Sequence, residues 1–162
     1  MSINNFTCYE NEILTWIRKS DSSSKIGFER EGLRIRDSLI SKESHPAKLG
    51  SALCNNYITT DFSEAQLELV TPAYEDKKVA IQFLRDIHHF VSNKLGDEYL
   101  WPFSMPINVE SDKDILIASY GNSNLAKFKQ IYRNGLSERY GKMMQIISGV
   151  HYNYSVPESI WK

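Results

Sequence analysis

Three stretches of the sequence place acidic or polar side chains at alternate positions. Their members are, in chain order, Glu29 and Glu31; Glu64, Gln66 and Glu68; and Gln145, Gly149, His151 and Asn153. Because alternate residues of a β-strand point to the same face, each stretch would form a strand with a polar face and an apolar back. Carboxylates that share a face repel one another unless water or a cation lies over them. We therefore expect a sheet whose concave side holds a divalent metal ion.

Composition narrows the class of protein. The chain has 162 residues, of which 41% are hydrophobic and 24% charged, as is usual for one globular domain with a sizeable core. A formal net charge of −1 gives no general attraction to nucleic acid or anionic lipid, and no apolar run reaches the ~20 residues that span a bilayer. Cys8 and Cys54 match neither a disulfide framework nor a metal motif, which favours a reducing cytoplasm.

The other segments are assigned from periodicity and turn residues. Apolar residues at helical spacing predict helices over residues 5–19, over residues 76–95 and, after a cap at residues 121–124, to about residue 139. The first polar strand would run over residues 25–36 and the third over residues 144–155. The middle one would run from residue 57 to Pro72, because proline cannot continue a strand in a sheet interior. Residues 41–53 are expected to form a loop, residues 100–106 an extended segment and residues 114–120 a short strand.

Several polar residues outside the three strands have ordinary explanations. Adjacent residues of a helix point about 100° apart, so His88 and His89 are poorly placed for joint metal binding. We expect His45 to be a solvated loop residue, and Lys129 and Arg133 to form a solvated basic face of the third helix. The predicted inward-facing residues of the two later helices are Ala80, Phe83, Leu84, Ile87 and Val91, and Leu125, Phe128, Tyr132 and Leu136.

Six blocks of the sequence resemble, in the same order, the N-terminal part of bacterial glutamate–cysteine ligase. They cover nearly everything from residue 25 to residue 161. Members of that family are considerably longer than this chain, so the resemblance implies that residues 1–162 are a single N-terminal fragment of the catalytic domain. The blocks are Gly27-Phe-Glu-Arg-Glu-Gly-Leu-Arg34, Tyr57-Ile-Thr-Thr-Asp-Phe-Ser-Glu64, Leu100-Trp-Pro-Phe-Ser-Met-Pro106, Tyr120-Gly-Asn-Ser-Asn124, Tyr132-Arg-Asn-Gly-Leu-Ser-Glu-Arg-Tyr140 and Met144-Gln-Ile-Ile-Ser-Gly-Val-His-Tyr-Asn-Tyr-Ser155.

The resemblance implies an activity and a fold. The family joins L-glutamate to L-cysteine through γ-glutamyl phosphate, using ATP and Mg²⁺ (or Mn²⁺), in the first step of glutathione synthesis in the cytoplasm. Its fold is α+β and related to glutamine synthetase, with a curved, mainly antiparallel sheet, helices on one side and metal ions in the hollow. The chain would then carry one wall of the active site, be nearly inactive alone, and expose apolar surface that the missing C-terminal part would cover, in cis or in trans.

The same resemblance implies roles for individual residues. The metal positions are Glu29, Glu31, Asp61, Glu68 and His151, and the cysteine pocket is formed by Phe62, Tyr132, Leu136 and Gln145. Arg133 would act in catalysis by meeting a substrate carboxylate, because its planar guanidinium suits that group. Asp61 is out of phase with Glu68, so the strand must bend or bulge near Phe62 and Ser63. Tyr132 and Leu136 could instead pack in the core, since both lie on the apolar stripe of the third helix.

Two other functions stay open. One is a related carboxylate–amine ligase that uses a different amine, and the other is a non-catalytic module that retains only affinity for Mg²⁺ or an amino acid. Supplying the C-terminal part of a relative and measuring cysteine-dependent ADP release would separate these functions. The partners expected on the leading hypothesis are L-glutamate, L-cysteine, ATP and the C-terminal part, with no nucleic acid and no membrane.

Overall fold

The computed structural model describes residues 24–157, together with residues 11, 12, 14, 15 and 18. Of the helix predicted over residues 5–19, the five described residues are helical, and the rest lies outside the described residues. No helix in the described part of the chain is long and apolar enough to cross a membrane. The elements follow in the order β1 (Lys25–Arg36), β2 (Leu39–Ile40), the 3₁₀ turn η1 (Ala47–Leu49), β3 (Ile58–Thr60), β4 (Gln66–Val70), α2 (Lys77–Ser92), β5 (Tyr99–Leu100), the 3₁₀ turn η2 (Asp112–Asp114), α3 (Asn124–Tyr140), α4 (Lys142–Gln145) and β6 (Val150–Ser155).

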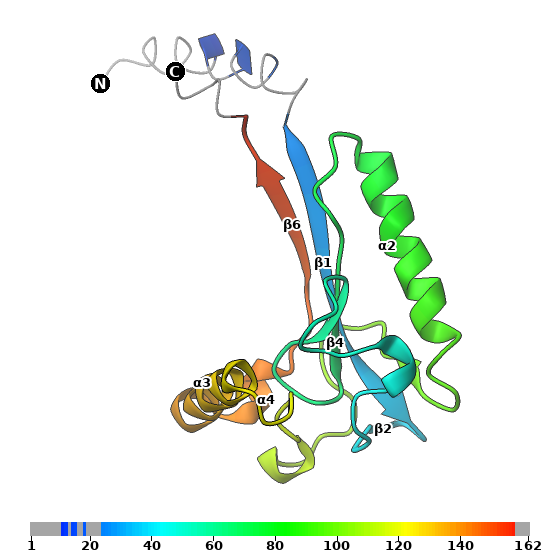
Figure 1. The fold of residues 1–162 in the computed structure, drawn as a ribbon, viewed down its shortest axis with the longest axis vertical. Helices are drawn as coiled ribbons and strands as arrows, with labels where there is room; N and C mark the ends of the chain where they lie inside the picture. The colour runs from blue at the N-terminus through cyan, green and yellow to red at the C-terminus, as the bar shows by residue number, and fades with distance from the viewer. Residues whose placement is uncertain (1–10, 13, 16–17, 19–23, 158–162) are drawn as a thin grey trace.

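The long strand β1 organises the sheet (Figure 1). β6 pairs with residues 25–30 of β1 on one side, β4 pairs with residues 29–33 on the other, and β3 pairs with the far edge of β4. β5 and β2 pair with the C-terminal end of β1. All of these pairings are antiparallel, as predicted, and β1 has the bounds that the alternation of residues 25–36 predicted. Its register against β4 and β6 decides which polar side chains meet.

Helix α2 covers one face of the sheet. The carboxylate of Asp76 caps its N-terminus by accepting a hydrogen bond of 2.7 Å from the backbone N–H two residues later. Ile87 and Val91 then pack with Leu67 and Leu69 of β4 in an apolar core. These contacts confirm the inward face predicted for this helix, and they leave the alternate side chains of β4 to point to the opposite face.

A second apolar core lies against that opposite face. It contains Leu33 and Ile35 of β1 with Phe62 and Ile146, and Leu136 of α3 packs against it. Helices therefore lie on both sides of the sheet, α2 on one and α3 with α4 beside the other (Figure 1), so the prediction of helices on one side only is wrong. The physical reason is that residues 31–35 of β1 are all buried, and a strand buried on both faces needs apolar cover on each.

Three of the predicted strands are wrong in extent. Residues 57–72 form the hairpin of β3 and β4, closed by a hydrogen bond of 3.0 Å from the Asp61 backbone N–H to the Gln66 carbonyl oxygen. Within residues 114–120 the only pairing in the described chain is a single bridge from Ile117 to Ser63. The polar strand predicted from residue 144 begins at Val150, because α4 occupies the residues before it. The loop over residues 41–53 is confirmed apart from the short turn η1.

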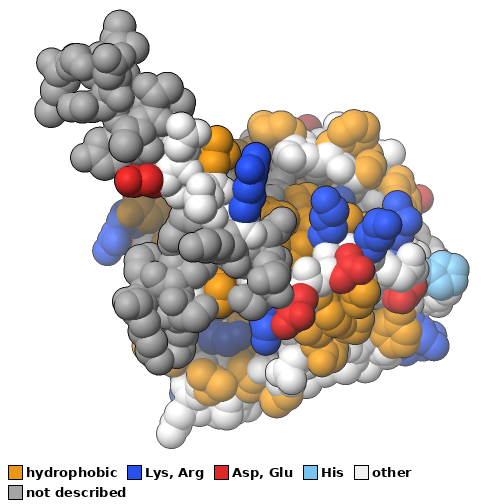
Figure 2. All heavy atoms as spheres, turned by 90° about the horizontal axis from the view of Figure 1, so that it is seen from above, with side chains coloured by type: hydrophobic (Ala, Val, Ile, Leu, Met, Phe, Trp, Pro, Cys, Tyr) orange, Lys and Arg blue, Asp and Glu red, His pale blue; other side chains and the backbone are white. Residues whose placement is uncertain are grey.

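The apolar stripe of α3 is mostly exposed to solvent. Leu125, Phe128 and Tyr132 expose 55%, 69% and 59% of their surface, and Leu136 alone of the stripe reaches the second core. The stripe is therefore not the core-facing side that its periodicity suggested. Figure 2 shows further hydrophobic side chains open to solvent among charged ones, on the face seen from the top of Figure 1. An apolar surface of this kind is what the family resemblance led us to expect.

Candidate metal and substrate site

The register of β1 gathers polar side chains from three strands. Glu29 lies directly opposite His151 of β6, and Glu31 lies directly opposite Glu68 of β4. Directly opposed residues of an antiparallel pair point to the same face of the sheet, so these four side chains share one face. That face is the one on which the second core lies, because Leu33 of β1 follows Glu31 at the next alternate position. The structure thus brings together four of the five predicted metal positions.

The carboxylates of Glu29 and Glu31 are held by the His151 ring, a backbone N–H and a side-chain amide. The His151 ring lies between them, with Nδ1 3.2 Å from Glu29 Oε2 and Nε2 3.5 Å from Glu31 Oε1. Asn153 Nδ2 donates a hydrogen bond of 2.9 Å to Glu29 Oε1, and the Gly149 backbone N–H donates one of 2.9 Å to Glu31 Oε2. These bonds fix the orientation of both carboxylates, which would otherwise be free to turn away from one another.

Asp61 approaches the same face from the turn between β3 and β4. Burial and, to a smaller extent, the neighbouring carboxylates of Asp61, Glu29 and Glu31 together raise the pKa of Glu68 to about 7. Burial also raises the pKa of Asp61, against the lowering effect of Arg133, and it raises the pKa of Glu31. The chain reaches this position by turning back in a hairpin, in place of the predicted bend or bulge. Four carboxyl groups therefore act on one another electrostatically.

These side chains do not by themselves enclose a metal ion. In the part of the chain that the structure describes, no three Asp, Glu, His or Cys side chains converge closely enough to enclose an ion. The His151 ring occupies the space between Glu29 and Glu31, so an ion would have to replace its contacts with their oxygens. The donor set itself suits a hard divalent cation, because it is mainly carboxylate oxygen and carries excess negative charge.

Arg133 reaches the turn that carries Asp61. Its Nε donates a hydrogen bond of 2.6 Å to the Asp61 carbonyl oxygen, and its Nη1 donates one of 3.2 Å to the Lys129 carbonyl oxygen. Its guanidinium carbon lies 4.9 Å from the centre of the Tyr120 ring. Arg133 is therefore half-buried beside the acidic face and is not the solvated basic residue that spacing alone suggested.

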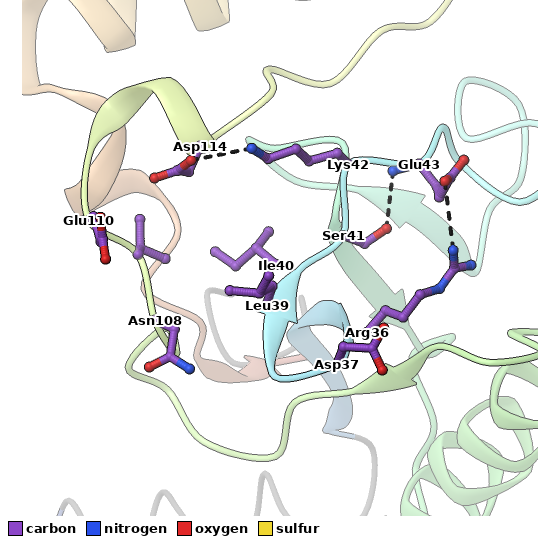
Figure 3. Close-up of a pocket in the computed structure, with 11 residues that line it drawn as sticks. Arg36, Asp37, Leu39, Ile40, Ser41, Lys42, Glu43, Asn108, Glu110 and Asp114 are labelled. Carbon is purple, nitrogen blue, oxygen red and sulfur yellow. Dashed lines mark hydrogen bonds and ion pairs between the residues drawn. The ribbon is translucent and has the colours of Figure 1, made fainter.

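A separate hollow of about 790 Å³ lies at the other end of β1 (Figure 3). Leu39 and Ile40 point into it, and the charges on its rim are largely paired, with Lys42 Nζ 3.3 Å from Asp114 Oδ1. None of the predicted metal or substrate residues lines this hollow. The candidate site is thus an open polar face, distinct from this hollow.

Comparison with known proteins assigns the family. Residues 15–162 match the family model described as Glutamate-cysteine ligase. This chain belongs to the glutamate–cysteine ligase family. Curated relatives named glutamate–cysteine ligase include one from Wigglesworthia glossinidia brevipalpis, 52% identical over 156 residues, and one from Vibrio parahaemolyticus, 54% identical over 136 residues. These alignments cover 94% and 83% of this chain but 31% and 26% of the relatives, so the chain spans about a third of their length.

Solved structures of related proteins have the same fold as this glutamate–cysteine ligase family chain. The glutamate–cysteine ligase of Francisella tularensis, crystallised in complex with AMP, superposes with a TM-score of 0.81 at 43% identity, over 85% of this chain and 28% of that one. A bifunctional glutathione synthetase from Pasteurella multocida gives a TM-score of 0.78 at 32% identity, over 91% of this chain and 19% of that one. The α+β architecture with an antiparallel sheet is therefore shared with these proteins.

The residues predicted to bind cysteine are only partly together in this ligase-family chain. Phe62 is 2% exposed and belongs to the second core, against which Leu136 packs. Tyr132 lies on the surface at 59% exposure, and Gln145 is half-buried at the end of α4. The structure thus supports the packing alternative for Leu136 and contradicts it for Tyr132. Their joint role in binding cysteine stays a prediction.

Three polar groups at the site had no role assigned from sequence. Asn153 shares its strand face with His151, and this alternation was the signal that could have identified it as a partner of Glu29. Gly149 belongs to the same alternation, but nothing in it identifies the Gly149 N–H as a donor to Glu31, and the Tyr120 ring had no signal of this kind. A backbone donor leaves no mark in the sequence, and Tyr120 belongs to a segment that forms no regular element.

The remaining histidines lie away from the acidic face. His45 is half-buried rather than solvated, because its loop packs around Arg34 and Glu64, and burial together with the nearby Arg34 lowers the pKa of its imidazole. His88 is half-buried and His89 exposed on α2, which covers the opposite face of the sheet. Both fit the prediction that they are packing or surface residues.

Proposed function

We propose that this chain forms one wall of the active site of an ATP-dependent ligase that joins the γ-carboxylate of L-glutamate to the amine of L-cysteine. The observation that carries the proposal is the acidic face, where register places Glu29, Glu31 and Glu68 beside His151. Family membership supplies the reaction, and the shared antiparallel sheet supports a glutamine synthetase-like architecture. The reaction would take place in the cytoplasm, as predicted from composition.

The acidic face fits a divalent cation such as Mg²⁺ or Mn²⁺. Burial, together with repulsion from Asp61, Glu29 and Glu31, holds the pKa of Glu68 near 7, and a bound cation would favour its ionised form. The residues that would hold it are Glu29, Glu31, Asp61, Glu68 and His151. When bound, the metal would neutralise charge on a phosphoryl group in transfer to a carboxylate.

The chain's own residues would orient the reacting groups. The Gly149 N–H and Asn153 keep the carboxylates of Glu31 and Glu29 aimed at the shared face. Arg133, held by the Asp61 carbonyl oxygen, presents a guanidinium beside that face and would meet a substrate carboxylate. We further propose that Tyr132, with Leu136, Gln145 and the buried Phe62 behind them, forms the wall that cysteine meets.

The partner that would complete the site is the C-terminal part of the enzyme. The curated relatives are about three times as long as the region they share with this chain. The exposed stripe of Leu125, Phe128 and Tyr132 on α3 is an apolar surface suited to covering by that part. We expect the isolated chain to have little or no ligase activity.

Complementation tests the proposal. The chain is mixed or co-expressed with the C-terminal part of the Wigglesworthia relative, and ADP release is measured with glutamate in the presence and absence of cysteine. Cysteine-dependent ADP release is expected, and Glu68→Gln should abolish it. Mn²⁺ binding to the chain alone, followed by electron paramagnetic resonance, is a second readout that needs no activity.

Other outcomes identify the other functions. Mn²⁺ binding without ADP release, after assembly has been demonstrated, would support a non-catalytic binding module. Equal ADP release with cysteine and with other amines would support a related ligase. Absence of Mn²⁺ binding by the assembled protein would contradict the proposed role of the acidic face.

A further inference from the structure

Two cations lie over one aromatic ring at the edge of the acidic face. Lys129 Nζ is 4.7 Å and the Arg133 guanidinium carbon 4.9 Å from the centre of the Tyr120 ring. The two side chains come from successive turns of α3, and both are half-buried. Each such contact with a ring contributes about 0.5–1 kcal/mol at an exposed site, which is comparable to the repulsion between two neighbouring cations. The ring alone therefore does not explain why both cations are held here.

Neither cation has a carboxylate oxygen within ion-pair distance in the described part of the chain, although Arg133 acts electrostatically on Asp61. Lys42 pairs with Asp114 and Arg34 with Glu98, but neither Lys129 nor Arg133 forms an ion pair within the described residues. Arg133 uses its donors on two backbone carbonyl oxygens, those of Asp61 and Lys129. Two half-buried cations with no carboxylate in direct contact have donors and charge that an oxyanion ligand could use.

The position of the pair is fixed by the strand that carries the acidic turn. The Tyr120 hydroxyl donates a hydrogen bond of 2.8 Å to the Thr60 carbonyl oxygen and accepts one of 2.9 Å from Thr60 Oγ1. Arg133 is held in turn by the next carbonyl oxygen, that of Asp61. Since Asp61 is one of the acidic residues, the cation pair and the acidic face are joined through two consecutive residues of the chain.

We propose that Lys129 and Arg133 form an oxyanion subsite for a phosphoryl group, next to the cation held by the acidic face. The inference rests on the proposed function, adds Lys129 to it as a binding residue, and makes the ligand of Arg133 the phosphoryl group that the substrate carboxylate receives. A carboxylate carries one charge, which Arg133 alone could meet. A phosphoryl group carries close to two charges and has three acceptor oxygens, so a divalent metal and two side-chain cations can share it. Tyr120 is the positioning residue that holds both cations.

Binding of inorganic phosphate to the chain tests the subsite. Phosphate is titrated calorimetrically into the chain in saturating Mg²⁺, and the affinity is compared among the wild type, Lys129→Met, Lys129→Arg and Lys127→Met. Lys127 is a matched control, because it lies exposed on the same helix. We expect Lys129→Met to weaken phosphate binding about tenfold or more, and the other two variants to stay within about twofold of wild type. Thermal unfolding of each variant checks that its fold is unchanged.

Three results would overturn the inference. The first is phosphate binding by Lys129→Met that equals that of Lys127→Met, while Mg²⁺ binding is retained; in this case the proposed function still stands. The second is a Lys129→Met variant that loses affinity for acetate but not for phosphate, which would make the pair a carboxylate subsite. The third is a wild-type chain that binds no Mg²⁺ under any of these conditions, which would contradict the metal site as well.

Discussion

The two ends of strand β1 both carry charged side chains, but they arrange them in opposite ways. At the C-terminal end, the fully buried Arg34 lies 2.7 Å from the Glu98 carboxylate and also donates to the carbonyl oxygens of Glu43 and Glu64. Nearer the N-terminal end, Glu29 and Glu31 share a face with Glu68, and the His151 ring lies between Glu29 and Glu31. Opposite charges at one end hold segments of the chain together, while like charges at the other destabilise the fold in the absence of a ligand.

Glu64 shows that sequence alternation alone does not tell which acidic residues belong to the acidic face. In the sequence it alternates with Glu68 and looks like a member of the same acidic face. In the structure its carboxylate accepts hydrogen bonds of 2.8 Å from the His45 N–H and 2.7 Å from the Ser119 N–H. Glu64 is therefore a buried structural acid whose carboxylate joins two loops.

The largest effect on the free energy of unfolding is expected at the C-terminal end of β1, where the charges are paired. Arg34→Met would leave Glu98 buried without its partner, so we expect a loss of about 3–5 kcal/mol in the free energy of unfolding, measured by urea denaturation. The double variant Arg34→Met/Glu98→Leu should recover a large part of this loss, because it removes both charges. A loss below about 1 kcal/mol in the single variant would show that this ion pair does not hold the end of β1 together.

Glu68→Gln is the corresponding change at the acidic end, and its effects should have opposite signs in two assays. Removing one of several repelling carboxylates should raise the free energy of unfolding of the metal-free chain at pH 8 by about 1 kcal/mol. The same change should weaken Mn²⁺ binding about tenfold or more, measured by electron paramagnetic resonance titration. If the variant is less stable without metal, the repulsion that we assign to this face is wrong.

The pH dependence of stability should reveal the cost of ionising Glu68 on the acidic face. Glu68 has a pKa of about 7 in the folded chain and an ordinary value of 4.5, so the folded state binds more protons between these values. The free energy of unfolding of the metal-free chain should therefore fall as pH rises from about 4.5 to about 7, by roughly 1–2 kcal/mol once solvent screening is allowed for. Urea denaturation across this range measures it, with Glu68→Gln as the control that should flatten the slope.

The parts of the fold that the sequence predicted are those in which one residue pattern determines the outcome. β1 was located correctly because polar and apolar residues alternate over residues 26–29 and again over residues 33–36, and the inward face of α2 because its apolar stripe is long and regular. The turn between β3 and β4 was missed because residues 61–65 contain neither glycine nor proline to signal it.

The parts that could not be predicted depend on which surfaces meet. The stripe of α3 has the same periodicity as that of α2, yet Phe128 and Tyr132 are exposed. Periodicity identifies an apolar side of a helix but not what covers it. The cation pair over Tyr120 likewise joins residues of α3 to an irregular segment before it, and only the tertiary structure places it next to Asp61.

The smallest expected effect is at Asn153, whose amide orients Glu29 through one hydrogen bond on the exposed strand β6. Asn153→Ala should change the free energy of unfolding by less than about 0.5 kcal/mol, because water can replace that bond. It should nevertheless weaken Mn²⁺ binding about threefold to tenfold, since groups that orient a ligand affect affinity more than stability. Asn56→Ala, in an exposed loop, is the matched control and should leave both quantities unchanged. Unaltered Mn²⁺ affinity in Asn153→Ala would mean that Glu29 needs no orienting partner. The arrangement of the carboxylates on the acidic face would then depend on strand register alone.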